Sequence, residues 1–257
     1  KQLLGKPYLN VFFKTILSKL FLIYEKKVFK KFDYLIAATP IIRDKILKIN
    51  QNTIDVNNFP ILEGALAEPL EWRKKKNSVC YVGGIDKSRG VYEIIESLSY
   101  TNEITLNLAG NFKQKSDKDI LVKHKSWKKV VDLGYLDKEG VKQVYEESKI
   151  GLVTLHPQIN YIESLTVKMF EYMEASLPVI ASHFSSWVSI IETYKCGICV
   201  NPLDPKEISK AINYLIENED VAMAMGENGK KAVLETYNWD NEELKLLEVY
   251  RKLSVIN

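Results

Sequence analysis

The most constraining feature of this sequence is a regular alternation of apolar runs and helical patterns in its central part. Short apolar runs of the β type occur at Val79–Val82, Ile104–Ala109, Val130–Leu133, Ile150–Leu155, Val179–Ala181 and Gly197–Val200. Between them, segments such as Val91–Leu98 and Val141–Ser148 have the apolar spacing of helices. Strands that alternate with helices predict a parallel sheet covered on both faces. The sequence therefore predicts an α/β chain with a Rossmann-like core.

The region before this alternation starts with an apolar and basic segment. Residues 8–31 are rich in Leu, Phe and Ile, with lysines at intervals, and predict a long amphipathic helix. Its apolar face either packs on a sheet or lies on an anionic membrane surface. A strand at Tyr34–Ala38, a helix opened by Thr39-Pro40 and an apolar strand near Ile54–Phe59 are expected to follow.

A stretch rich in structure-breaking residues separates the two regions. It contains Pro60, Glu63, Gly64, Pro69 and the polar run Arg73–Asn77. Such a composition is typical of a domain boundary. Farther along, Asp204-Pro205 combines a helix N-cap with a proline at the first helical position, and helices are expected from there to Lys252. We therefore expect a first domain at 1–60, a parallel-sheet domain at 61–236 and a C-terminal helix at 237–257.

The composition of the chain bears on its binding partners and on its cellular compartment. The 257 residues include 36 basic and 33 acidic side chains, a net charge of +3, and nucleic-acid-binding proteins usually carry a much stronger basic excess. The three cysteines form no regular framework, which favours a reducing compartment. The sequence contains no run of about 18 uncharged apolar residues, which is the length that predicts a membrane-spanning helix. We expect a cytoplasmic protein that binds no nucleic acid, and the start at Lys1 leads us to expect a cut N-terminus.

In an open parallel sheet, ligands bind at the carboxyl ends of the strands. The turn after the first strand of the alternation, Gly83–Gly90, reads Gly-Gly-Ile-Asp-Lys-Ser-Arg-Gly and leads into a helix. Its two glycines let a ligand approach the backbone closely, and Arg89 offers a donor fork that matches phosphate. The spacing fits neither the dinucleotide-binding nor the Walker pattern. The turn is either a phosphate-binding loop or a plain glycine turn.

The stretch after Leu155 holds two glutamates on either side of an expected helix start. Glu163 lies in the loop and Glu171 in the second helical turn, while the helix begins near Leu165–Val167. The free amides and positive dipole end of a helix start suit a diphosphate. Carboxylates accept paired hydrogen bonds from sugar hydroxyls. This order provides partners for sugar, diphosphate and ribose, although the spacing by itself is a weak signal.

Taken together, these motifs resemble glycosyltransferase family 4, the group 1 glycosyl transferases of GT-B fold. The matching residues are Glu163 and Glu171 with seven residues between them, Ala175, the strand Pro178-Val179-Ile180-Ala181 and the loop Val82–Gly90. The family loop has an arginine where this chain has Gly84 and a lysine where it has Arg89. This departure weakens the expected clamp on the diphosphate, for which Lys87 or Lys168 is a candidate substitute.

The resemblance implies a retaining, metal-independent transferase that takes a UDP- or GDP-linked sugar as substrate and uses no cofactor. By this resemblance Glu163 holds the donor sugar hydroxyls and is the candidate catalytic residue, Glu171 holds the ribose hydroxyls, and the turn Gly134-Tyr135-Leu136 faces the base. The expected donor-binding residues are Gly83, Gly84, Arg89, Tyr135, Leu136, Glu163, Ser164, Leu165, Thr166, Val167, Lys168 and Glu171.

The resemblance also implies which part of a longer enzyme this chain represents and where that enzyme acts. Residues 1–60 correspond to the last elements of a truncated N-terminal acceptor domain, and the helix Glu242–Lys252 corresponds to the one that returns toward it. The implied acceptor is a glycan or a lipid-linked molecule, in bacterial surface polysaccharide synthesis at the cytoplasmic face of the inner membrane. A truncated chain is expected to turn over little. Two other functions stay open, a nucleotide-sugar epimerase or hydrolase of the same architecture and a non-catalytic sugar-nucleotide-binding module.

Other patterns are given a structural interpretation. Cys196 and Cys199 have the spacing of half a metal site but fall in a buried strand, and we expect structural thiols. Gly226–Lys231 resembles a phosphate loop superficially, and we expect a helix break there. His124 has no obvious partner, and His156, just past a strand end, either lines the donor pocket or plays a structural role.

Overall fold

A computed structural model describes residues 11–62 and 72–256 of the chain. The chain divides into two compact units. The terminal unit comprises Lys1–Phe59, Gln158–Leu165 and Trp239–Asn257, and the sheet unit comprises Pro60–Pro157 and Thr166–Asn238. The expected boundary residues Glu63, Gly64 and Pro69, and the expected helical residues 8–10, lie outside the described residues.

The sheet unit is built on a six-stranded, all-parallel sheet of order β5-β4-β3-β6-β7-β8. Its strands are β3 (Ser78–Val82), β4 (Thr105–Ala109), β5 (Val130–Gly134), β6 (Ile150–Val153), β7 (Val179–Ser182) and β8 (Gly197–Val200). The inner strands β6 and β7 are buried along their whole length, as continuous apolar runs predict for a sheet that is covered on both sides. The predicted α/β fold with a Rossmann-like parallel sheet is confirmed.

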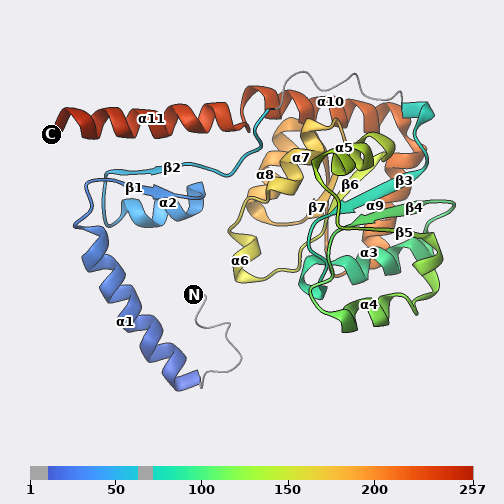
Figure 1. The fold of residues 1–257 in the computed structure, drawn as a ribbon, viewed down its shortest axis with the longest axis horizontal. Coiled ribbons are helices and arrows are strands. Elements are labelled where there is room, and N and C mark those ends of the chain that lie inside the picture. Colours follow the sequence, from blue (N-terminus) through green and yellow to red (C-terminus); the bar gives the residue numbers. More distant parts are fainter. Residues whose placement is uncertain (1–10, 63–71, 257) are drawn as a thin grey trace. The chain divides into compact units, whose positions relative to one another are not determined.

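Helices lie on both sides of this sheet (Figure 1). They are α3 (Val91–Ser97), α4 (Lys115–Leu121), α5 (Lys138–Glu147), α7 (Val167–Glu174), α8 (Ser185–Tyr194), α9 (Pro205–Glu217) and α10 (Glu219–Glu235). On one face, α3 and α9 share a buried apolar core with β3, β4 and β6. On the other face, α7 packs so closely on β6 that a Cβ added to Gly151 would lie 2.3 Å from the ring of Tyr172. Short 3-10 turns complete the unit at Trp72–Lys74, Lys87–Arg89, Leu98–Tyr100 and Lys125–Lys129.

Breaker residues occur at the start of one helix and inside another. Asp204 caps α9, with its carboxylate accepting from the amide of Lys206, and Pro205 occupies the start of the helix as expected. The expected helix break at Gly226–Lys231 is wrong, because α10 runs through it without interruption. A Cβ on Gly226 would lie 2.2 Å from the carbonyl oxygen of Ser176. The glycine therefore permits a close packing contact and does not end the helix.

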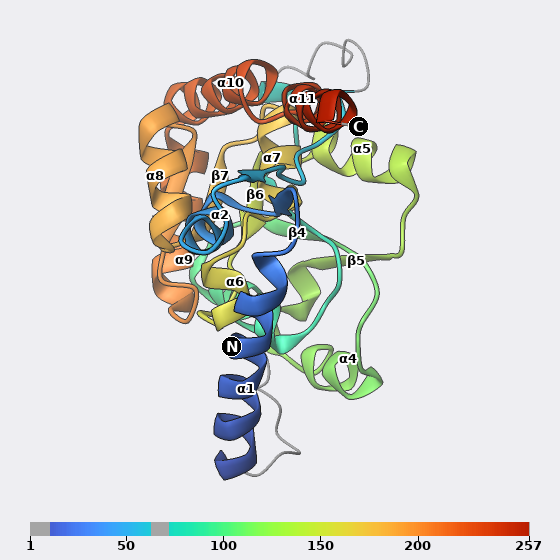
Figure 2. The same ribbon diagram turned by 90° about the vertical axis from the view of Figure 1, so that its left-hand side faces the viewer.

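The terminal unit contains α1 (Val11–Phe29), α2 (Pro40–Leu47), α6 (Ile159–Ile162) and α11 (Trp239–Ile256). It also contains a parallel pair of strands, β1 (Leu35–Ala37) and β2 (Thr53–Asp55). Helix α2 packs on this pair (Figure 1, Figure 2).

The expected strand near Ile54–Phe59 ends early, at Asp55. The amide of Asn57 donates to Oε2 of the buried Glu242 at 2.8 Å, and its own side-chain amide also donates to Asp55. The amide of Val56 still donates to the carbonyl of Ala37 in β1 at 2.9 Å, and at Asn57 the side chain of Glu242 replaces the neighbouring strand as the acceptor.

Helix α1 exposes large apolar side chains on more than one side. Leu20, Phe21, Leu22, Ile23 and Tyr24 are consecutive and all exposed. Five consecutive helical positions sweep more than one turn, so these side chains do not form the single stripe expected of an amphipathic helix. Among the described residues, no helix has the length and apolar character that a membrane crossing requires.

Candidate functional site

The strand order places a topological switch point in the middle of the sheet. From β3 the chain moves outward through β4 and β5, and then returns to the other side of β3 to build β6, β7 and β8. In such sheets the crevice at the carboxyl ends of the two central strands is the usual ligand site. The carboxyl end of β3 continues directly into the Gly83–Gly90 loop.

Backbone contacts hold this loop tightly against its neighbours. The amide of Gly83 donates to the carbonyl of Ala109 at 2.9 Å, and the amide of Gly110 donates to the carbonyl of Gly134 at 2.7 Å. Gly83 and Gly110 adopt φ values of 130° and 142°, and a Cβ on Gly110 would lie 1.9 Å from the carbonyl oxygen of Gly83. Only glycine fits at position 110. The hydrogen bonds of Gly83 and Gly110 join the ends of β3, β4 and β5 into a continuous backbone surface.

Arg89 folds back over the position where the family loop has its arginine. Its guanidinium carbon and Nε both lie 3.7 Å from the place that a Cβ of Gly84 would take. Asp86 caps the turn before it by accepting from the Arg89 amide at 3.1 Å, and its other carboxylate oxygen lies 3.6 Å from the Arg89 Nε. Arg89 thus places a positive charge beside Gly84.

Lys168, in the first turn of α7, adds a second positive group beside the loop. Its side chain is buried, and its Nζ lies 3.0 Å from the Cβ position of Gly83 and 3.5 Å from the ring centroid of Tyr81. Burial, followed by the nearby charge of Arg89, lowers the pKa of Lys168 to about 7 against the opposing effect of Glu171. The Nζ has no hydrogen-bond partner. A buried ammonium without an acceptor is costly, and an anionic ligand at Gly83 would satisfy it.

Glu171 lies in the second turn of α7, as expected, and is held by a tyrosine that the sequence did not single out. The hydroxyl of Tyr145 donates to Glu171 Oε2 at 3.1 Å. Burial, followed by the charge of Glu171, raises the pKa of Tyr145, so the tyrosine stays a donor. The hydroxyl of Tyr172 accepts from the amide of Val82 at 3.1 Å and ties α7 to the end of β3. These two tyrosines orient α7 and the Glu171 carboxylate.

The expected start of α7 is also present. The helix begins at Val167, and Thr166 occupies the cap position without forming a side-chain cap hydrogen bond. Beyond β5, Tyr135 exposes 75% of its surface, which leaves its ring accessible to a base, and Leu136 is half-buried. The sheet unit thus brings the loop residues Gly83, Gly84 and Arg89, at the carboxyl end of β3, together with Lys168 and Glu171 in the first two turns of α7.

Three of the expected donor residues, Glu163, Ser164 and Leu165, belong to the terminal unit. Glu163 is the C-cap residue that follows α6, and its Oε2 accepts a hydrogen bond from Lys45 Nζ at 2.7 Å. The hydroxyl of Ser164 donates to the carbonyl of Tyr161 at 3.0 Å. The donor-binding set expected from the sequence is therefore divided between the two units.

The histidines and cysteines have structural environments. His124 is hydrogen-bonded to Glu96 at 2.6 Å and accepts from the amide of Ser126, so the expectation that it lacks a partner is wrong. His156 Nε2 lies 3.0 Å from Glu93 Oε2, and both atoms are buried without a hydrogen-bond partner. Burial raises the pKa of Cys196 to about 11 and that of Cys199 to about 12. Within residues 11–62 and 72–256, no cluster of His, Cys, Asp and Glu has the arrangement of a metal site.

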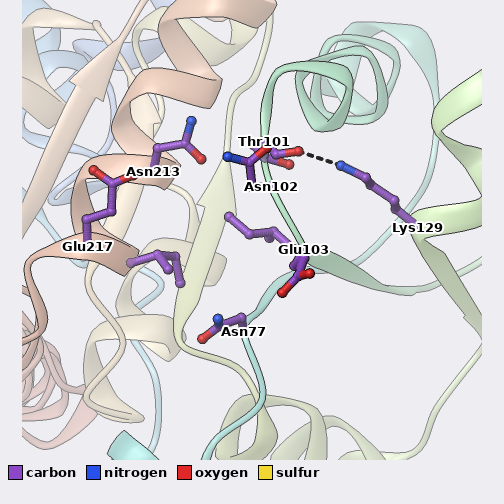
Figure 3. A pocket seen from close by; sticks show the side chains of 9 residues that line it. Asn77, Thr101, Asn102, Glu103, Lys129, Asn213 and Glu217 are labelled. Atoms are coloured by element: carbon purple, nitrogen blue, oxygen red, sulfur yellow. Dashed lines mark hydrogen bonds between the residues drawn. The ribbon is translucent and has the colours of Figure 1, made fainter.

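A pocket of about 500 Å³ lies on the sheet unit at the amino ends of its strands (Figure 3). Its lining residues are Asn77, Thr101, Asn102, Glu103, Ile104, Lys129, Asn213, Ile216 and Glu217. Lys129 is committed to two backbone carbonyls, those of Leu98 at 2.8 Å and Thr101 at 2.6 Å. The carboxylates of Glu103 and Glu217 would repel a diphosphate. The pocket therefore lacks the charge of a donor site.

Comparisons with known proteins bear on the family of this chain. The model of the family described as glycosyl transferases group 1 matches residues 64–232, which is more than half of the chain. An uncharacterized glycosyltransferase of Methanocaldococcus jannaschii is 24% identical over 264 residues, covering 96% of this chain and 64% of its own length.

Two solved structures share the fold. Sucrose-phosphate synthase from Thermosynechococcus elongatus aligns with a TM-score of 0.72 and 21% identity, over 92% of this chain and 62% of the synthase. HepE from Anabaena, in complex with UDP, aligns with a TM-score of 0.71 and 15% identity, over 85% of this chain and 64% of HepE. The chain thus spans less than two thirds of the length of these three proteins. The family match, the parallel sheet and the loop at its switch point lead to one conclusion: this chain belongs to the glycosyl transferases group 1, a family of GT-B fold.

Proposed function

We propose that this chain binds the donor in a retaining glycosyltransferase that moves a sugar from a nucleotide-diphosphate sugar to a glycan or lipid-linked acceptor. The observation that carries the proposal is the buried, unpartnered Nζ of Lys168 beside Gly83. An ammonium held in such a place favours an anionic ligand with several acceptor oxygens, and a diphosphate is one.

The other groups of the site fit the remaining parts of a donor. Arg89 supplies a second cation beside the loop, and the uncapped start of α7 supplies amide donors. Glu171 and Glu163 hold the hydroxyls of the ribose and of the donor sugar, and Tyr135 and Leu136 face the base. UDP and GDP are the candidate nucleotides, and the UDP bound to the Anabaena protein makes UDP the first to test.

In the proposed reaction, the bond between the anomeric carbon and the diphosphate oxygen breaks, and the diphosphate leaves with the electron pair. The acceptor hydroxyl bonds to the anomeric carbon, and its proton passes to the departing diphosphate. Charge therefore develops mainly on the departing diphosphate, where Lys168 and Arg89 stabilise it. Electrostatic stabilisation of this kind is usually the largest contribution to catalysis.

We also propose that the protein contacts an anionic membrane through α1, in bacterial surface polysaccharide synthesis at the cytoplasmic face. Large apolar side chains are exposed along the helix, and Lys26, Lys27, Lys30 and Lys31 follow at its C-terminal end. Exposed apolar groups beside a basic cluster are typical of proteins that bind the surface of anionic bilayers.

Calorimetry with nucleotides tests the donor-binding proposal. UDP or GDP should bind, and uridine or guanosine should bind at least about tenfold more weakly, because hydrogen bonds to charged groups contribute about 1.5–3 kcal/mol. Lys168→Met should weaken diphosphate binding about 10- to 100-fold, while the exposed Lys210→Met should leave it unchanged. Equal affinities for nucleoside and diphosphate, or no effect of Lys168→Met, would refute the proposal.

Product analysis separates the proposed transferase from other enzymes. With a nucleotide-sugar donor, sugar should appear on an added acceptor. Release of free sugar or of an epimerised donor, with no requirement for acceptor, would instead indicate a hydrolase or epimerase.

A further inference from the structure

Helix α2 makes two contacts with Glu163, the residue proposed to hold the donor sugar. The first comes from Thr39, the N-cap of α2, whose hydroxyl accepts from the amide of Ile42 at 3.3 Å and donates to the carbonyl of Glu163 at 3.5 Å. One side chain thereby joins the first turn of α2 to the backbone of Glu163.

The second contact comes from the last turn of the same helix. Lys45 Nζ lies 2.7 Å from Glu163 Oε2, although the two residues are 118 positions apart in sequence. Their side chains are 46% and 29% exposed, and half-exposed ion pairs contribute little to folding stability. The main effect of this pair is therefore on the direction of the Glu163 carboxylate and not on the stability of the fold.

The local backbone does not fix Glu163 by itself. The residue follows α6, Ile159–Ile162, which is a single helical turn, and it has φ −96° and ψ 2°. A helix of one turn is unstable on its own, because nucleation of a helix is unfavourable. The position of Glu163 therefore depends on tertiary contacts, and those from Thr39 and Lys45 both come from α2.

We propose that Lys45 is a positioning residue for the donor sugar, which orients the Glu163 carboxylate toward the sugar hydroxyls while Thr39 fixes the backbone behind it. This inference rests on the proposed function of Glu163. It assigns to α2 a part in sugar recognition that is separate from the binding of the diphosphate by Lys168 and Arg89.

The test uses the intact protein with Lys45→Met, Lys45→Arg and, as a matched control on the same helix, Lys48→Met, which removes an exposed lysine. Calorimetry measures the affinity for UDP and for the UDP-sugar that the wild-type protein binds, or for the GDP pair if guanosine is preferred. Lys45→Met should leave the affinity for the nucleoside diphosphate unchanged. It should reduce the additional affinity that the sugar contributes about tenfold, and it should lower kcat/KM as well. Lys45→Arg should restore most of it, and Lys48→Met should behave as the wild type.

A double-mutant cycle shows whether Lys45 acts through Glu163. In a Glu163→Gln background, adding Lys45→Met should produce no further loss of sugar affinity. Equal losses in both backgrounds, a matching loss of diphosphate affinity, or wild-type behaviour of Lys45→Met would overturn the inference. If the wild-type protein binds no nucleotide diphosphate, the proposed function fails, whereas diphosphate binding with an unaltered Lys45→Met refutes the role of Lys45 alone.

Discussion

At the scale of single residues, Lys168, which we propose to bind the donor diphosphate, is buried and its Nζ has no hydrogen-bond partner. Its pKa is lowered to about 7 by burial and by Arg89, so a large part of the side chain is neutral at pH 8 when no ligand is present. A bound diphosphate favours the ammonium form and raises the pKa, so the protein takes up a proton on binding above pH 7. Donor affinity should therefore fall as the pH rises, by up to about tenfold per unit.

Calorimetry from pH 6.5 to 8.5 checks this dependence, with a nucleotide sugar as ligand because its diphosphate does not titrate in that range. Measurements in buffers of different ionisation enthalpy report the proton uptake directly. Lys168→Met should abolish both the uptake and the pH dependence. A wild-type affinity that is flat across this range would contradict the expected coupling.

The sequence predicted the contacts between individual residues of the site least well. It indicated Lys168 and Glu171 as donor residues, and these assignments stay predictions. It gave no sign of Tyr145, which is 26 positions from Glu171, or of Lys45, which is 118 positions from Glu163. Such partners meet only through tertiary packing, and no local pattern records them.

At the scale of elements, the contact between α10 and α7 depends on two glycines. A Cβ at Gly226 would lie 2.2 Å from the carbonyl oxygen of Ser176, whereas one at Gly229 would lie 3.2 Å from Cβ and Cγ of Met173. Gly226→Ala should lower the free energy of unfolding by about 1–3 kcal/mol through overpacking. Gly229→Ala should change it by less than about 1 kcal/mol, because the gain in helix propensity offsets the tighter fit. Urea denaturation measures both, and equal effects would show that the backbone contact is unimportant.

Elements with a strong periodic signal were predicted well. The six strands of the sheet fall at the apolar runs, because a strand buried on both faces needs apolar residues at every position. The predictions failed where glycine or asparagine acts through a distant partner. Gly226 permits close packing inside α10, and Asn57 turns from β2 toward Glu242. From the sequence alone, Gly226 indicates a helix break and Asn57 falls within the expected strand, because neither pattern records the distant partner.

At the scale of the whole molecule, the exposed apolar surface of α1 predicts binding to anionic vesicles. The intact protein should sediment with vesicles that contain phosphatidylglycerol, and less with pure phosphatidylcholine. Lys26→Gln with Lys27→Gln should reduce the binding, and added salt should do the same, because screening weakens the attraction between the lysines and the headgroups. Lys230→Gln with Lys231→Gln, in α10 of the sheet unit, is the matched control. No binding to either vesicle would refute a membrane role for α1.

The expected domains stay a prediction. Their boundaries fall at 60 and 236, and the compact units change after Phe59 and Asn238. The segment Gln158–Leu165 falls within the expected sheet domain, 61–236, and it clusters with the terminal unit. The contacts of Glu163 with Thr39 and Lys45 account for this, since they bind the segment to α2.

The stacked glycines at the ends of β3 and β4 have a consequence for engineering new donor preferences. Any side chain at Gly110 would collide with the carbonyl of Gly83, so libraries that randomise this position would yield mostly unfolded variants. Diversity belongs instead at neighbouring positions whose side chains have room, such as Tyr135 or Gly84. A rigid backbone that tolerates variation beside it lets one scaffold acquire many specificities.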